Sequence, residues 1–515
     1  MNDASIEAVF GKWDGERGAF MTRARECAAF TLPDVLPWQW SGLDADIYRP
    51  FQSLGSDGTA NLVSKLLMAL FPTGLPWFGH RPSIRLRASD ASPEQLEEFA
   101  DWLFLRDRLI LEHMEAQHYR VAMRSLLEHV LVVGDTVGRI TDDYEIQQYR
   151  KDHFVLRRNG RGRVRAVITK ERVEAEELDD EVLARMAQTR EELQKLSDER
   201  ELWLYTMGER QRDGRWSIRQ QILKQTVVES VEPVNPYLTP GYVELPGEHY
   251  SRSFIEERIG DLRSFNGLSK AILDAAAIAA KHNPVVDPTK NWVATDLETP
   301  NGAVLEGRVT GNVPDGIGYI RVEKSHDMAF ALNQSDRIEK RLGKQLLLET
   351  AARREGERVT ATEVMRTARE LDGALGAAYA RICGEIQQPY LDRITYQMER
   401  DRLLVPLPKP MDPAVDVQIL TGMAAIRQTG DLEKLGAAMQ LAGQMPGGLE
   451  RIRFDEVVRQ IFKALNLPID KLLKTDDEIA AEREAALRQQ GLVEAQSQAI
   501  QSAGSIAETA AKGAA

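Results

Sequence analysis

The sequence predicts an α+β fold that is predominantly helical and divided into several structural units. Three features predict it: apolar residues recur in steps of three and four over most of the chain, residues 138–222 contain strand-like runs, and the helical pattern at 360–404 is unusually long. The chain has 515 residues, 43% of them hydrophobic and 28% charged, so it can bury sizeable cores in three or more structural units.

Helices are expected throughout the N-terminal quarter of the chain. Residues 59–71 form a compact apolar helix, which Pro72 and Gly74 end because neither residue continues a helix well. Residues 93–112 and 119–133 follow with the same helical periodicity. These segments therefore predict consecutive helices.

Strands are predicted in the region that follows. Turns at Asn159-Gly160 and Asp213-Gly214 divide the strands into two hairpins, and a charged helix at 177–200 separates the hairpins. The predicted strands are 154–157, 164–169, 202–207 and 216–222. The run 157–163 has four arginines beside two glycines, as a phosphate-binding loop could have, but no helix N-terminus follows it. We therefore interpret this run as a hairpin tip.

Two helices are predicted at 260–282 and 326–349, on either side of an irregular, strand-prone stretch at 284–319. At about 100° per residue, the second helix has a narrow cationic arc and an apolar stripe on its far side. The cationic arc consists of Arg337, Lys340, Arg341 and Lys344. The apolar stripe consists of Met328, Ala331, Ile338, Leu342 and Leu346. Such an arc is either a solvated face or a surface that meets a phosphate backbone, where lysine and arginine release counterions.

A charged loop at 351–360 follows this helix. It carries three arginines and two glutamates around one glycine, and two of the arginines, Arg353 and Arg354, are adjacent. The loop is either a solvated turn between two helices or a segment presented to a binding partner.

The longest predicted helix spans 360–404. It begins at a capping box, because the hydroxyl of Thr360 and the carboxylate of Glu363 have the spacing that satisfies unpaired N–H groups at a helix start. Pro389 predicts a kink. The apolar positions are Val364, Ala368, Leu371, Leu375, Ala378, Ile382 and Ile386. A helix of roughly forty residues is about 60 Å long, more than an ordinary globular domain needs, and indicates a large assembly.

A proline-rich stretch separates this helix from the C-terminal part of the chain, since four prolines between 404 and 414 make a stiff boundary. Beyond it, short helices are predicted at 413–427, 431–442 and 454–464. The tail at 476–515 is rich in alanine, glutamine and glutamate, with high helix propensity but a weak apolar face. Such a helix is either frayed or stabilised by copies of itself.

Composition limits the possible contacts with nucleic acid and the cellular compartment. With 66 basic and 79 acidic residues, the formal charge is −13, so the chain is not a general DNA binder. A local cationic arc on an acidic body would suit a surface along which DNA slides. Cys27 and Cys383 lack the spacing of a zinc site or a disulfide framework, which favours a reducing cytoplasm. No signal peptide or membrane-spanning run is recognised, so we expect a soluble protein that no signal peptide exports.

Catalytic motifs are absent from the sequence. It contains no phosphate-binding P-loop, no His-Glu-x-x-His and no Gly-x-Ser-x-Gly. His113 and His118 are five residues apart and do not share a helix face well enough to chelate a metal. We expect no cofactor, no metal site and no enzymatic activity.

Four stretches carry a resemblance to a known family. They are Thr22 to Pro33; Gly58 to Pro72, with Asn61-Leu62-Val63-Ser64-Lys65-Leu66; Tyr250-Ser251-Arg252-Ser253 leading to Gly260-Asp261-Leu262-Arg263-Ser264; and Gly356-Glu357-Arg358-Val359-Thr360-Ala361. In this order they resemble the head-to-tail connector, or portal, proteins of short-tailed bacteriophages, and the resemblance covers nearly the whole chain.

The resemblance implies a portal-protein fold with wing, stem, clip and crown regions. Residues 1–259 would form the wing, 260–282 and 326–349 the stem helices, 283–325 the clip, 350–359 the tunnel loop, 360–404 the long wing helix, and 405–515 a helical crown with a barrel-like C-terminal tail. The implied assembly is a dodecameric ring. Its channel would be faced by some of Arg337, Lys340, Arg341, Lys344, Arg353 and Arg354.

The implied function is that of a head-tail connector at the capsid vertex of the virion, made in the host cytoplasm and without a membrane contact. Double-stranded DNA would pass through the channel during packaging and ejection. The protein would nucleate procapsid assembly with scaffolding and major capsid proteins, dock the terminase, and then hold the tail adaptor. Two other classes stay open on the residues alone: a non-viral helical scaffold or adaptor, and a nucleic-acid-processing enzyme with a metal or nucleotide site.

Overall fold

The computed structural model contains two compact units. It describes residues 5–37, 48–73, 75–83, 93–174, 202–280, 283–286, 309–310, 313–314, 317–320, 325–348, 361–404 and 415–420, with isolated positions between 178 and 195 and between 439 and 444. Unit 1 comprises Met1–Phe78, Arg106–Asp412 and Gln418–Ile426; unit 2 comprises Gly79–Leu105, Pro413–Val417 and Arg427–Ala515. The elements below belong to unit 1 unless stated otherwise.

The N-terminal region is helical, as the apolar periodicity predicts. Its helices are α1 (Ile6–Glu16), α2 (Gly18–Phe30), α3 (Leu54–Leu70), α5 (Pro93–Ala116, which runs from unit 2 into unit 1) and α6 (Tyr119–Val133), with a short 3-10 helix at Pro33–Val35. The predicted segments at 59–71, 93–112 and 119–133 correspond to α3, α5 and α6. Helix α3 begins five residues earlier than predicted, at Leu54. It packs on α6, and both helices are mostly buried.

A five-stranded antiparallel sheet follows, and it contains the four predicted strands and one more. The strands are β4 (Phe154–Arg158), β5 (Val164–Arg172), β6 (Trp203–Arg210), β7 (Trp216–Ile222) and β8 (Gln225–Glu232), paired in sequence order. The arginine-rich run is a hairpin tip, because Asn159 N–H donates to Arg163 O at 2.9 Å and Gly162 N–H donates to Asn159 O at 3.0 Å. The charged helix predicted at 177–200 lies almost entirely outside the described residues.

The two faces of this sheet are covered by different parts of the chain, because side chains alternate along each strand. On one face, residues of β4, β5 and β6 pack against α1, whose buried side chains are Ile6, Phe10 and Trp13. On the other face lies a second antiparallel sheet in the order β3-β2-β9, with β2 at Val137–Ile140, β3 at Ile146–Tyr149 and β9 at Tyr237–Leu238. Neither β8 nor this second sheet is predicted from the sequence.

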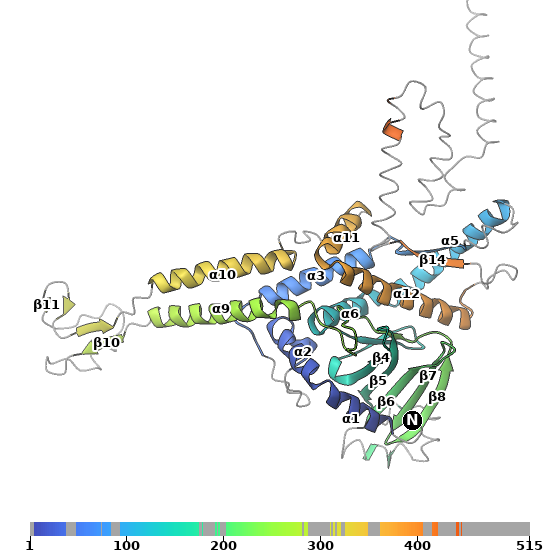
Figure 1. The fold of residues 1–515 in the computed structure, drawn as a ribbon, viewed down its shortest axis with the longest axis horizontal. Helices are drawn as coiled ribbons and strands as arrows, with labels where there is room; N and C mark the ends of the chain where they lie inside the picture. The colour runs from blue at the N-terminus through green and yellow to red at the C-terminus, as the bar shows by residue number, and fades with distance from the viewer. Residues whose placement is uncertain are drawn as a thin grey trace, which may run out of the picture. The chain divides into compact units, whose positions relative to one another are not determined.

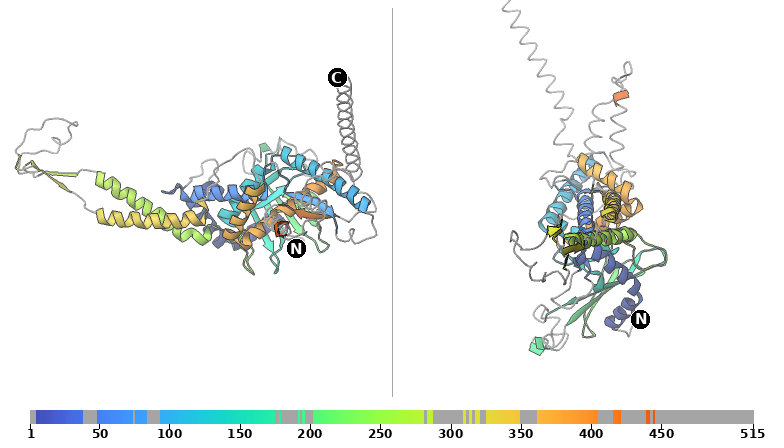
Figure 2. Two further views of the ribbon diagram at one scale, coloured as in Figure 1. Left: turned by 90° about the horizontal axis from the view of Figure 1, so that it is seen from above. Right: turned by 90° about the vertical axis from the view of Figure 1, so that its left-hand side faces the viewer.

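Helices α9 (Ile259–Ala280) and α10 (Ser325–Gln345) form a long pair joined by short strands. Strand β10 (Asn283–Val286) pairs antiparallel with β13 (Ile317–Ile320), and β11 (Val309–Thr310) pairs with β12 (Val313–Pro314). The two helices lie side by side in Figure 1 and in the left view of Figure 2, with the short strands at the end away from α3. The helices predicted at 260–282 and 326–349 are confirmed over 260–280 and 326–345.

The long helix predicted at 360–404 is wrong as a single element. It is two helices, α11 (Ala361–Leu375) and α12 (Ala377–Arg400), which Gly376 separates. Gly376 has φ 54° and ψ −127°, a conformation that glycine adopts freely and that interrupts the helical hydrogen bonds. Pro389 lies inside α12 and does not end it. The seven predicted apolar positions are all buried, so the predicted face is confirmed across the break.

A second correction concerns the C-terminal part. Residues Val415–Ile419, expected to be helical, form strand β14, which pairs with β1 (Phe78–Pro82). Most of each of these two strands belongs to unit 2. Val415, Val417 and Ile419 recur at every second position, and these branched side chains favour extended backbone. Most of 421–515, including the tail predicted to bundle, lies outside the described residues, as does the capping hydroxyl of Thr360.

Helix α3 makes a close contact with α10 through a glycine. A Cβ atom at Gly58 would lie 2.8 Å from Leu346 Cβ and 2.4 Å from Leu346 Cδ1, both shorter than real contacts. Leu346 is buried, so it has little room to move away. Glycine at position 58 therefore allows the end of α10 to approach the α3 backbone.

We expect Gly58→Ala to destabilise the protein by about 1–3 kcal/mol, because overpacking displaces buried Leu346. Thermal unfolding followed by circular dichroism measures the effect. The matched control is Gly373→Ala in α11, where nothing lies within 4 Å of the added Cβ and alanine favours the helix by about 0.5–1 kcal/mol. Equal melting temperatures for Gly58→Ala and the parent protein would contradict the close contact.

Candidate functional site

The cationic arc of α10 lies on an exposed helix face. Arg337, Lys340, Arg341 and Lys344 are all exposed. Arg341 forms an ion pair of 2.5 Å with Asp261 of α9. Within the described residues, no carboxylate pairs with Arg337, Lys340 or Lys344. The arc therefore presents three uncompensated charges at helical spacing, with Arg341 at the edge nearest α9.

The far side of α10 is apolar, as predicted. Leu342 and Leu346 are buried, and Met328, Ala331 and Ile338 are partly buried. The middle of the helix pair also exposes large apolar side chains: Leu273 is 55% exposed, Phe330 66% and Leu332 47%. The pair thus carries both unpaired cations and uncovered apolar surface.

The two loop arginines predicted to approach DNA, Arg353 and Arg354, lie outside the described residues. The described chain stops at 348, after α10, and resumes at 361, at the start of α11. Their proposed role stays a prediction.

The C-terminal end of α10 is capped by side chains of α3. Asn61 Nδ2 donates to Leu346 O at 3.2 Å and to Leu347 O at 3.0 Å, and Lys65 Nζ donates to Leu347 O at 3.1 Å. The last carbonyl groups of a helix have no partner inside the helix, and a cation is favoured at this negative end. Leu347 has φ 56°, which ends the helix.

Sequence reasoning recognised Asn61 and Lys65 only as part of a family-like stretch and missed their role. A signal was present, because both are polar residues in the otherwise apolar predicted helix at 59–71. Lys65 is only 2% exposed. A buried ammonium group needs a partner, but the sequence does not say where along the chain the partner lies.

A buried charge network stabilises the junction of α6 and the sheets. Asp135 is fully buried and accepts hydrogen bonds from Lys151 Nζ at 2.9 Å and from Ser251 N–H at 2.8 Å. Arg158 Nη2 lies 3.7 Å from the same carboxylate. Ser251 belongs to another of the four family-like stretches, so the structure gives this stretch a packing role.

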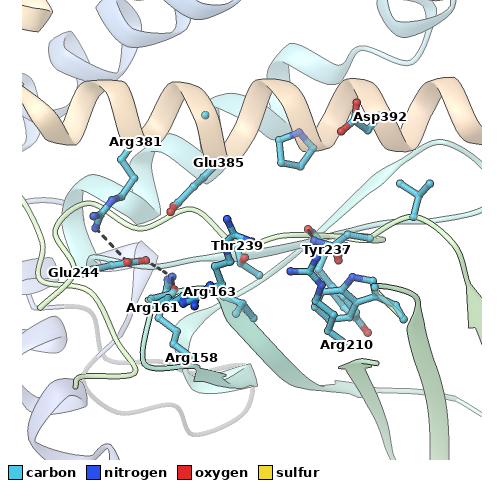
Figure 3. Close-up of a pocket in the computed structure, with 18 of the residues that line it drawn as sticks. Arg158, Arg161, Arg163, Arg210, Tyr237, Thr239, Glu244, Arg381, Glu385 and Asp392 are labelled. Carbon is cyan, nitrogen blue, oxygen red and sulfur yellow. Dashed lines mark hydrogen bonds and ion pairs between the residues drawn. The ribbon is translucent and has the colours of Figure 1, made fainter. Parts of the chain in front are cut away.

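A recess of about 730 Å³ lies between α12 and the ends of two hairpins (Figure 3). Arg158, Arg161 and Arg163 contribute from the β4–β5 hairpin and Arg210 from β6, while Arg381, Glu385 and Asp392 contribute from α12. Glu244 forms ion pairs with both Arg158 and Arg381, the latter at 3.5 Å. The charged side chains that line the recess thus connect the five-stranded sheet to α12.

Glu385 has an unusual proton affinity in this recess. Burial raises the pKa of its carboxyl to about 7, although the Gly241 N–H group, which donates to Oε2 at 2.9 Å, and the nearby Arg158 guanidinium both lower this pKa. The charge of Glu244 raises it further. Glu385 is therefore partly protonated at neutral pH.

Metal and membrane features can be judged only over the described part of the chain. There, no group of three or more His, Cys, Asp or Glu side chains is arranged to hold a metal ion. Cys27 and Cys383 are free and buried. No helix among these residues combines the length and apolar character needed to cross a bilayer.

Comparison with known proteins gives the family. A family model described as bacteriophage head to tail connecting protein matches residues 3–473. The portal protein of Escherichia phage T7 is 30% identical over 449 residues, which cover 83% of this chain and 80% of that protein. The portal protein of Enterobacteria phage T3 is 28% identical, with 93% and 90% covered, and that of Pseudomonas phage phiKMV is 26% identical, with 95% of each covered.

The chain therefore belongs to the bacteriophage head to tail connecting protein family, and the resemblance identified from four stretches is confirmed. Proteins that connect a head to a tail are structural components of the virion.

Replacing Glu385 with glutamine should stabilise the protein more at pH 8 than at pH 5. The folded-state pKa of about 7 exceeds the ordinary value near 4.5, so the stabilising effect of the protonated form is complete below about pH 4.5 and is lost as the pH rises through 7. Glu385→Gln keeps an acceptor for Gly241 N–H and removes this loss. The difference in melting temperature between variant and parent, measured at both pH values, tests the prediction.

The matched control is Glu229→Gln, which makes the same side-chain change at an exposed position of β8. An equal difference in melting temperature at pH 5 and pH 8 for Glu385→Gln would show that the Glu385 carboxyl titrates normally.

Proposed function

We propose that this chain is the portal protein of a short-tailed bacteriophage, forming a dodecameric ring around a channel through which double-stranded DNA is packaged and ejected. In this proposal the protein nucleates procapsid assembly with scaffolding and major capsid proteins, docks the terminase, and then holds the tail adaptor. It is a structural protein of the capsid vertex, synthesised in the host cytoplasm, and not an enzyme.

The observation that carries the proposal is the cationic face of α10 on a chain with a formal charge of −13. Three of its four cations have no carboxylate partner among the described residues. The acidic body repels a polyanion, whereas these three cations can contact phosphates without reading a base sequence. Repeated around a ring, the arc would become stacked rings of charge that contact DNA but do not hold it at one sequence. The family membership supports this assignment.

The regions implied by the family can be matched to the observed elements. The wing, 1–259, would include helices α1, α2, α3, α5 and α6, the five-stranded sheet and the β3-β2-β9 sheet. Helices α9 and α10 would be the stem helices of 260–282 and 326–349, and the short strands β10–β13 would belong to the clip, 283–325. The wing helix, 360–404, would be α11 and α12 together. The tunnel loop, 350–359, and most of the crown, 405–515, fall outside the described residues.

Electron microscopy of the purified full-length chain tests the proposal most directly. Rings with an open central channel are the expected result. Uniform monomers or dimers across a range of salt and protein concentrations would remove the ring on which the proposal depends and would favour a helical adaptor instead.

Changing Arg337, Lys340 and Lys344 together to glutamine should leave rings intact but reduce DNA packaging or retention. None of the three has a carboxylate partner in the described structure, so their loss leaves no unpaired charge behind. Ring assembly is measured by electron microscopy and packaging by the amount of nuclease-protected genome in particles.

The matched control replaces Lys12, Arg212 and Lys224 with glutamine, which removes the same number of exposed, unpaired charges from the α1 and five-stranded-sheet region. This variant should package as the parent does. Loss of rings in the arc variant would place the arc at a subunit contact, and equal packaging by both variants would remove its role with DNA.

A further inference from the structure

Lys65 makes two contacts on opposite sides of the undescribed interval 349–360. On one side, Lys65 Nζ donates to Leu347 O, just after α10, at 3.1 Å. On the other side, it forms an ion pair of 2.8 Å with Glu370 Oε1 in α11. The two partners are 282 and 305 residues away from Lys65 in the sequence. One side chain of α3 therefore connects the end of α10 to α11.

The burial of Lys65 is costly enough to require an explanation. Its side chain is 3% exposed, whereas that of Glu370 is 25% exposed. Removing an ammonium group from water is costly, and a well-placed ion pair does little more than offset that cost. An apolar residue would pack in this position of α3 without the penalty. A lysine differs from an apolar residue because its hydrogen bonds are directional and require their acceptors to lie at defined positions.

The contacts fix α10 along its own axis. Gly58 accommodates Leu346 so closely that a Cβ at position 58 would clash with it, and Asn61 binds the carbonyls of Leu346 and Leu347. A slide of α10 by a single residue moves these groups by about 1.5 Å, which is enough to break hydrogen bonds of 3.0–3.2 Å. Helix α3 therefore acts as a stop for α10.

The axial position of α10 sets the position of the cationic arc. Lys344, the last cation of the arc, precedes Leu347 by three residues, or about 4.5 Å of helix. Arg337 and Lys340 lie earlier on the same helix face, so one contact at the end of α10 places all three. Through its ion pair with Glu370, Lys65 also contacts α11.

We propose that Lys65 is a positioning residue that holds the cationic arc at a fixed level relative to α3 and ties α10 to α11. This inference rests on the proposed portal function, in which the arc faces DNA. Lys65 acts through Leu347 and Glu370 and does not itself touch DNA.

The test compares Lys65→Met with Lys65→Arg in the full-length chain. Nitroxide labels are attached at Asp57→Cys on α3 and Glu339→Cys on α10, which are both exposed positions. The native cysteines are buried, and burial raises the pKa of the Cys27 thiol to about 12, so background labelling is low. Labelled chains are diluted with unlabelled chains before assembly, so that distances within one subunit are measured.

The expected result is a narrow distance distribution for the parent and for Lys65→Arg, and a broad one for Lys65→Met, together with a loss of packaging by intact Lys65→Met rings. Rescue by arginine separates the positioning role from side-chain volume. The control Lys224→Met makes the same change at an exposed lysine next to β8 and should leave both measurements unchanged.

Glu370→Gln is a second variant in case Lys65→Met does not assemble, because it removes the charge that pairs with Lys65 and leaves the lysine that binds Leu347 O. It should partly reproduce the packaging loss.

A narrow distribution in Lys65→Met, or normal packaging despite a broad one, would overturn the inference. Absence of rings in the parent would instead overturn the proposed function, and the distances could still be measured in the single chain.

Discussion

The close contact between α3 and the end of α10 is the constraint on which the rest of the described arrangement depends. Gly58 allows the approach, Leu346 fills it, and Lys65 orients it by binding Leu347 and Glu370 at once. Helix α3 is itself buried against α6, so the contact is made on a rigid support. Contacts with α3 therefore position both the α9–α10 pair and the α11–α12 pair.

Buried charges have a similar role elsewhere in unit 1. Asp135 contacts Lys151, Ser251 and Arg158. Arg393 of α12, which is 1% exposed, pairs with Glu232 of β8. Such pairs contribute little net stability, because desolvation offsets their attraction. They are directional, however, and each joins segments that are distant in the sequence. The apolar faces supply most of the stabilisation, and the charges select one arrangement among several that would bury similar area.

The distribution of charge explains how an acidic chain could contact DNA in the proposed ring. Many cations of the described part are used in ion pairs, which reduces their attraction for phosphate. On the α10 face, Arg337, Lys340 and Lys344 follow one another at helical spacing, are exposed, and have no carboxylate partner among the described residues. In the proposed ring, the acidic body would limit binding elsewhere and leave contact to the channel. A weak, sequence-independent contact is what passage of DNA requires.

The sequence by itself determined the helices whose apolar side chains recur regularly, the four strands of the two hairpins, and the two faces of α10. These follow from backbone periodicity, which is a property of a short window. The sequence could not decide between one helix and two at 360–404, because a break at Gly376 leaves the apolar register intact on both sides. Nor could it pair Lys65 with Glu370, because no local pattern relates residues 305 positions apart. Only the tertiary structure, which closes that distance through packing, decided where the buried charges find their partners and which cations stay free.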